Sequence, residues 1–290
     1  MPTSAVPRVS CRQIAAGDLE RIAGLLANGF PERSRDYWLT VLNRLAERPN
    51  RLEIPRFGYL LEIGETAVGA VLLIANKLPE HDAPVRYNLS SWYVTPAFRA
   101  HAATLINHAM RRYPGTYVNL TADPNTWPTI EAQGFRRYSD GVFMFAPALS
   151  RGVGRSRARL VGRRTTIDGR MPEYERQLLL DHAGYGCISM WCEDDRGVHP
   201  FVFLRRWSGW KVPYAHLVYC RNSEDLVRLA APIGRTLALR GLPLVMIDAN
   251  EPLSGLSGHF IKNKMPRYYR GSQAPRVGDL SYTELSMFGV

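Results

Sequence analysis

The side chains best suited to catalysis lie on two predicted strands of the C-terminal half. In strand 214–220 alternate residues face opposite sides, which puts His216 on one face and Tyr219 on the other. Asp248 ends a second apolar strand, a position where α/β proteins often carry functional groups. A histidine can accept a proton from an attacking nucleophile. We therefore take His216, Asp248 and Tyr219 as candidate catalytic residues. A hydrogen-bonded core histidine and a turn-forming Asp248 remain alternatives.

A second chemical signal is a basic segment in the middle of the chain. Residues 151–164 read RGVGRSRARLVGRR and contain six arginines, three glycines and no acidic residue. Its glycine content is typical of a flexible, solvated linker. Its charge is also suited to the phosphates of nucleic acid, a nucleotide or coenzyme A (CoA). Both interpretations remain open.

Composition limits the class of protein. The 290 residues include 37 Lys and Arg against 26 Asp and Glu, a net charge of +11, and 46% are hydrophobic. This apolar content excludes a mainly disordered chain. The four cysteines are too few and too scattered for a disulfide framework or a metal site, and we expect no metal. The most apolar stretch, 67–75, is about half the ~20 residues of a membrane span. We therefore expect a cytoplasmic protein without a membrane span.

The N-terminal half predicts alternating helices and strands. Asp18 and Ser34 are placed to cap two amphipathic helices, and Gly64-Glu65 is a hairpin signal between two apolar strands. Further elements follow in the order strand 87–94, helix 98–113, strand 116–121, a short helix ending at Gly134-Phe135, and strand 138–145.

The C-terminal half repeats part of this order. Its predicted elements are strands 186–192, 200–206 and 213–220, a helix starting at Ser223, and strand 244–248. Shifting the chain by 127 positions places Tyr87 on Tyr214 and Val118 on Val245. We predict two similar α/β domains, 1–150 and 165–290, joined by an Arg/Gly-rich linker at 151–164.

One segment carries a resemblance to a known superfamily. Residues 92–99 (WYVTPAFR) are followed by a helix, by residues 121–125 (TADPN) and by Gly134-Phe135. Over residues 8–146 this order resembles the GNAT acyltransferases, and the two halves together resemble the tandem-domain type. The resemblance implies an α/β (α+β) fold of two GNAT-like domains. Each would have a mixed, mostly antiparallel central sheet flanked by helices.

The resemblance also implies a site for CoA. In that superfamily a strand ending in V-x-P leads to an R/Q-x-x-G-x-G/A turn, and the helix after it holds the CoA pyrophosphate with free N–H groups. Carried over to this chain, the CoA-binding residues are Val94, Arg99, His101, Ala102, Ala103, Thr104 and Asn125.

The chain departs from this motif at several positions. Ala102 and Thr104 replace glycines, and each added Cβ narrows the approach to a phosphate. Ile130 stands where many members have a tyrosine that protonates the leaving thiolate. The CoA motif is therefore degenerate, with His101 as a possible replacement donor.

The function implied by the resemblance is acyl transfer. We expect an acyltransferase that moves the acyl group of acetyl-CoA or another acyl-CoA to an amine or hydroxyl of a small-molecule or sugar acceptor, without a metal. Two alternatives remain open. One is a Fem-type transferase, also a tandem GNAT protein, which uses aminoacyl-tRNA and would suit the basic charge. The other is a catalytically degenerate binding or regulatory protein.

Overall fold

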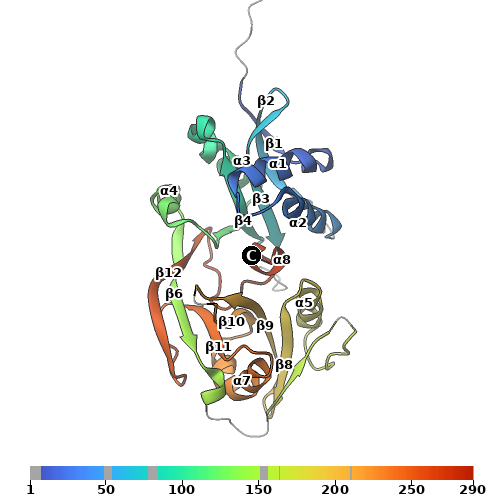
Figure 1. Ribbon diagram of the computed structural model, residues 1–290, viewed down its shortest axis with the longest axis vertical. Coiled ribbons are helices and arrows are strands. Elements are labelled where there is room, and N and C mark those ends of the chain that lie inside the picture. Colours follow the sequence, from blue (N-terminus) through green and yellow to red (C-terminus); the bar gives the residue numbers. More distant parts are fainter. Residues whose placement is uncertain are drawn as a thin grey trace, which may run out of the picture. The chain divides into compact units, whose positions relative to one another are not determined.

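Apolar runs separated by glycine, proline and charged residues form strands that largely follow the predicted order. The structure is a computed structural model that describes residues 8–48, 54–77, 84–150, 156–162, 164–209 and 211–289. Two units contain these residues. Unit 1 comprises the chain up to Phe135 together with Arg270–Gln273, and unit 2 comprises Arg136–Tyr269 and the chain from Ala274 onward. Figure 1 shows the elements of each unit.

Unit 1 is a five-stranded mixed sheet with helices packed against it. Its strands lie in the order β1-β2-β3-β4-β5. The pairs β1–β2, β2–β3 and β3–β4 are antiparallel, and the pair β4–β5 is parallel. The strands are β1 (Ser10–Gln13), β2 (Gly58–Ile63), β3 (Thr66–Asn76), β4 (Arg86–Val94) and β5 (Thr116–Asn119). The helices are α1 (Leu19–Gly29), α2 (Arg35–Glu47), α3 (Ala102–Arg112) and α4 (Trp127–Ala132).

Unit 2 contains seven strands of mixed direction in the order β12-β6-β11-β10-β9-β8-β7. The pair β10–β11 is parallel, and the other neighbours are antiparallel. The strands are β6 (Arg136–Phe145), β7 (Arg157–Leu160), β8 (Ile188–Asp194), β9 (Gly197–Trp207), β10 (Pro213–Cys220), β11 (Leu244–Ala249) and β12 (Gly258–Arg270). The helices are α5 (Glu173–Gly184), α6 (Ser223–Arg228), α7 (Ala230–Ala238) and α8 (Glu284–Met287).

The predicted repeat of element order extends to strand register. Tyr87 pairs with Tyr117 in the parallel ladder of β4 and β5. Tyr214 pairs with Leu244 in the ladder of β10 and β11, and each residue of this pair lies 127 positions after its counterpart. The two halves therefore place the end of a central strand, and the helix that follows, in comparable local settings.

The units divide the chain at other points than the predicted domains 1–150 and 165–290. Strand β6 belongs to unit 2, because it is paired with both β11 and β12 and buries Phe143 and Phe145 in the core of that unit. Part of the expected linker 151–164 is also a strand, since Arg157–Leu160 pairs with β8 as β7. Residues 151–155 and 163 lie outside the described residues.

Local signals explain where several helices start. Ser34 caps α2 as predicted, and its Oγ accepts a hydrogen bond from the Tyr37 N–H at 3.1 Å. The cap before α6 is Asn222, one residue earlier than the predicted Ser223, and its Oδ1 accepts the Asp225 N–H at 2.7 Å. The helix predicted from Ser223 is interrupted at Leu229. Pro232 has no N–H, so it cannot donate the helical hydrogen bond to the carbonyl of Arg228, four residues earlier.

A matched pair of glycine substitutions tests the packing of α7. A Cβ on Gly234 would lie 2.2 Å from the backbone nitrogen of Ala148, whereas a Cβ on Gly24 of α1 meets nothing within 4 Å. We expect Gly234→Ala to lower the free energy of unfolding by about 1–3 kcal/mol through overpacking. Gly24→Ala should leave it unchanged or raise it by up to about 1 kcal/mol. Urea denaturation of both variants measures the difference, and equal effects would contradict the close approach at Gly234.

Candidate functional site

In unit 1 the two parallel strands β4 and β5 pair over only part of their length. The ladder joins Arg86–Leu89 to Thr116–Asn119, where β5 ends, whereas β4 continues to Val94. Within this continuation the pairing of β4 with β3 slips, and Ser91 adopts a left-handed backbone conformation with φ of 52°. Such a bulge bends a strand and redirects its side chains. The edge of β4 beyond Leu89 is therefore not covered by β5.

Polar groups gather along this continuation of β4. The Oγ atoms of Ser90 and Ser91 lie 3.0 Å apart. The Trp92 indole Nε1–H is buried and has no hydrogen-bond partner among the described residues. Asn119 is buried at the end of β5. A buried donor without a partner is uncommon in proteins, and such an N–H is able to donate to a ligand.

The sequence-predicted CoA residues Val94–Thr104 lie together where β4 leads into α3. The predicted helix 98–113 begins as a 3₁₀ helix, Pro96–His101, which leads directly into α3. Arg99 and His101 are exposed, and the first turns of this helix and of α3 carry no acidic residue. The Ala102 N–H is already used, because the Arg99 carbonyl accepts it. The start of α3 is thus positively charged, with fewer free N–H groups than the motif implies.

The predicted residue Asn125 lies on a different loop, in the 3₁₀ helix Pro124–Thr126 after β5. Its backbone N–H donates to the Asp123 side chain at 2.8 Å. Ile130 is buried in α4. Asn125 and Ile130 therefore lie in elements other than the turn before α3.

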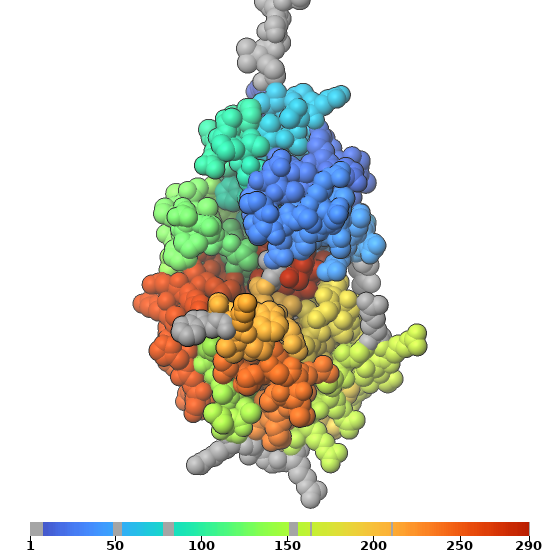
Figure 2. Space-filling view, in the orientation of Figure 1, coloured from blue at the N-terminus to red at the C-terminus, as the bar shows by residue number. Residues whose placement is uncertain are grey.

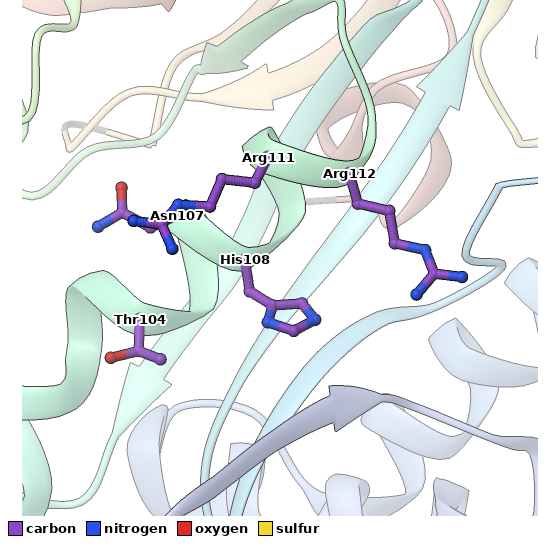
Figure 3. Close-up of a pocket in the computed structure, with 5 residues that line it drawn as sticks. All are labelled: Thr104, Asn107, His108, Arg111 and Arg112. Carbon is purple, nitrogen blue, oxygen red and sulfur yellow. The ribbon is translucent and has the colours of Figure 1, made fainter.

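An open hollow of about 610 Å³ lies along α3. Figure 3 shows the five side chains that line it, all projecting from α3: Thr104, Asn107, His108, Arg111 and Arg112. Arg111 and Arg112 are exposed, and neither has an ion-pair partner among the described residues. The positive charge of Arg111 and Arg112 therefore attracts anions to the hollow. Thr104, in the first turn of α3, lines the end of the hollow nearest the start of the helix.

In unit 2 the corresponding strand edge is filled. The parallel ladder of β10 and β11 covers only Tyr214–His216, and the pairing of β10 with β9 slips between Leu217 and Tyr219. Beyond this point the C-terminal segment pairs with β10. The Cys220 N–H donates to the Gly278 carbonyl at 3.0 Å, and the Leu280 N–H donates to the Val218 carbonyl at 2.7 Å.

The helix that follows β10 begins with acidic residues. Glu224 and Asp225 lie in the first turn of α6. Asp225 forms an ion pair with Arg228 at 2.5 Å, and its Oδ2 lies 2.9 Å from His199 Nδ1. An anion would meet two carboxylates at this helix start. Unit 2 therefore lacks both features that leave the corresponding point of unit 1 open and positive.

His216 and Asp248, predicted separately, are brought together by the structure. His216 Nε2 on β10 lies 3.5 Å from Asp248 Oδ1 on β11, and Arg267 of β12 donates from Nε to Asp248 Oδ2 at 2.8 Å. Each of these residues is at most 2% exposed. No described residue forms a hydrogen bond of good geometry with either His216 ring nitrogen.

Burial and charge set the protonation of this cluster. Burial lowers the His216 pKa below 6.5, against the opposing influence of Asp248, so the ring is neutral at pH 7. Burial alone would raise the pKa of Asp248, but Arg267 and His216 together outweigh burial and lower that pKa to about 2. A neutral imidazole beside a carboxylate has the chemistry of a proton acceptor. In this structure it is enclosed by protein.

Tyr219 belongs to a different cluster. Its hydroxyl lies 2.9 Å from that of Tyr174 and donates to Glu175 Oε1 at 3.1 Å, and Arg221 Nε donates to the same oxygen at 3.0 Å. Burial raises the Tyr219 pKa above its usual value. Among the described residues no hydrogen bond or ion pair joins Tyr219 to His216 or Asp248. The catalytic assignment of these three residues stays a prediction.

Comparison with solved structures identifies the architecture. A GCN5-related N-acetyltransferase from Anabaena variabilis superposes with a TM-score of 0.59 at 9% identity, over 91% of this chain and 72% of that one. A putative acetyltransferase from Pyrococcus horikoshii gives 0.55 at 12%, over 97% and 96%. A probable N-acyltransferase from Enterococcus faecalis gives 0.55 at 10%, over 94% and 73%.

The fold is that of the GCN5-related N-acetyltransferases. No family model and no curated protein matches the sequence. The GNAT resemblance of the sequence and its α/β fold class, with mixed sheets flanked by helices, are thus confirmed at the level of fold. No helix among the described residues has the length and apolarity of a membrane span. The described residues contain no group of three or more His, Cys, Asp or Glu side chains that could hold a metal ion. The expectation that the protein uses no metal stays a prediction.

Several residues of interest on this GNAT fold were missed by sequence reasoning. Arg267 was not singled out, because no periodic pattern marks the residues around it. Glu175 lies in the first turn of α5, where acidic residues are common at the surface, yet it is fully buried. For Trp92 and Ser91 a signal did exist, since two adjacent serines lie in the strand directly before Trp92.

The buried ion pair gives a testable energetic prediction. Arg267→Met would leave the Asp248 carboxylate buried without its main partner, so we expect a loss of about 3–5 kcal/mol in the free energy of unfolding. In the double variant Arg267→Met/Asp248→Asn the uncompensated charge is gone, and a substantial part of the loss should be recovered. Chemical denaturation of both variants tests this. A double variant that is no more stable than Arg267→Met would argue against the pairing.

Proposed function

We propose that the protein is an acyl-CoA-dependent acyltransferase and that unit 1 binds the CoA thioester. The observation that carries the proposal is the contrast between the two halves at the same point of the fold. In unit 1 the edge of β4 is uncovered and the following helix starts with Arg99 and His101. In unit 2 the chain pairs with that edge, and Glu224 and Asp225 begin the helix.

The features of unit 1 match the parts of CoA. The pantetheine arm carries two amides, which can pair with an uncovered strand edge as an added strand does. The phosphates are suited to a helix start without acidic residues beside Arg99, and to the hollow with Arg111 and Arg112. The buried Trp92 N–H supplies a donor that lacks an acceptor among the described residues.

The proposed reaction is direct transfer. The lone pair of an acceptor amine or hydroxyl attacks the thioester carbonyl, a C–N or C–O bond forms, and the C–S bond breaks to release the CoA thiolate. The proton lost by the nucleophile passes to a base, and the thiolate takes up a proton. Ile130 cannot supply that proton, so we propose that solvent does. The acceptor class remains a small molecule or sugar with an amine or hydroxyl.

His216 is the proposed base. It is neutral at pH 7, and Asp248 lies beside it to stabilise the imidazolium that proton transfer forms. Because the ring is enclosed, packing around β10 must open before a nucleophile reaches it. A second candidate function, binding without catalysis, is favoured by this enclosure and by the Ala102 N–H that is already used.

Titration calorimetry with CoA and acetyl-CoA tests the binding part. We expect Arg99→Glu to weaken the affinity at least tenfold, because it places an acid where the phosphates would lie. Arg35→Glu is the matched control, since it makes the same charge change at the exposed start of α2, and it should have little effect. Absence of binding at millimolar CoA, or equal effects of the two substitutions, would overturn the proposal.

Thiol release from acetyl-CoA, measured over a panel of amines and amino sugars, tests the base. We expect His216→Gln to lower kcat by a factor of about 100 or more while the affinity for CoA is kept. The kcat of the unaltered protein should stay level at pH 6.5 and fall only at lower pH, because burial lowers the pKa of the ring that must be neutral, and the variant should lose this dependence. His259→Gln, at an exposed histidine, is the control. Normal CoA binding without turnover of any acceptor would instead support binding without catalysis.

A further inference from the structure

A second positively charged hollow lies in unit 2, between the edge strand β7 and helix α7. Its open volume is about 410 Å³. Arg157 and Arg159 of β7 and Arg235 of α7 line it, and Leu239 adds an apolar side chain that is 90% exposed. In Figure 2 the yellow-green of β7 and the orange of α7 lie at the same end of unit 2.

The charge of this hollow is not balanced by the protein. No acidic side chain lines it, and its three arginines are exposed and have no ion-pair partner among the described residues. Glu193 lies across the ladder from Arg157, but its carboxylate is bound by Arg170. Asp168, which is close enough to Arg159 to be influenced by its charge, is bound by Arg170 as well.

The position of the arginines indicates more than protection of a sheet edge. Charged residues on an edge strand prevent pairing with other chains, which explains Arg157 and Arg159 on β7. It does not explain Arg235, which comes from a helix and shares the same concavity. Three guanidinium groups around one hollow repel each other, and a multivalent anion relieves that repulsion.

We propose that this hollow binds a ligand with two or more adjacent phosphate groups. A guanidinium group can bind a phosphate through two parallel N–H···O hydrogen bonds, so several phosphates can be held at once. Leu239 offers an apolar surface next to them, suited to a nucleobase. A nucleoside polyphosphate and the backbone of a nucleic acid share this chemistry. The hollow is separate from the CoA site proposed for unit 1.

Binding of inorganic tripolyphosphate, measured by titration calorimetry at low salt, tests the site. The variant Arg159→Gln/Arg235→Gln removes two charges from the hollow. Arg136→Gln/Arg196→Gln removes two from exposed positions of unit 2 outside it. We expect at least a tenfold loss of affinity in the first variant and less than a threefold change in the second. Circular dichroism checks that both variants fold, and Arg235→Gln alone, on the helix, should reproduce part of the loss.

The same titration with ATP and with a short single-stranded RNA distinguishes the two sources of phosphate. Similar affinities for ATP and tripolyphosphate, both sensitive to the first variant, identify a nucleotide ligand. Much tighter binding of RNA, with a steep dependence on salt and the same sensitivity, identifies a nucleic acid. No binding of any probe at millimolar concentration, or equal losses in both variants, would overturn the proposal, since the latter indicates only general charge.

Discussion

The central constraint on this structure is that two neighbouring parallel strands separate after a few residues. Bulges in β4 and β10 turn these strands away from their parallel partners, β5 and β11. Backbone N–H and C=O groups of β4 and β10 are then left without a partner strand along that edge. Buried groups of this kind must be satisfied. Unit 2 does so with its own residues 278–280. In unit 1 no described segment takes that place, and the functional proposal follows from this difference.

Charge divides the halves in the same way. Asp225 at the start of α6 lies against His199 and Arg228, so that helix start is a structural junction. The start of α3 carries exposed basic groups with no comparable network. Deeper in unit 2, Arg267 keeps Asp248 ionised in the core, and the neutral His216 lies beside it. Such a cluster is costly to desolvate, and its geometry ties β10, β11 and β12 together.

Much of the fold could be predicted from the sequence because its signals are local. Gly64-Glu65 between apolar runs fixes the β2–β3 hairpin, and Ser34 caps α2 as expected. The placement of β6 could not be predicted, because the apolar pattern of residues 138–145 suits either sheet. The same holds for the site. The candidate turn from Val94 to Thr104 is contiguous in the sequence, so its residues could be named together, whereas the pairing of Arg267 with Asp248 depends on register between distant strands.

The division of the chain between the units has a consequence for synthesis. Residues 270–273 belong to unit 1, where the Gln273 carbonyl accepts a hydrogen bond from Thr116 and the Gln133 carbonyl accepts one from Arg270. A ribosome must therefore complete almost the entire chain before the first unit has all its residues. Until then the end of β5 lacks these contacts, although all five strands of unit 1 have already been made. These contacts of unit 1 therefore form only after most of unit 2 has been translated.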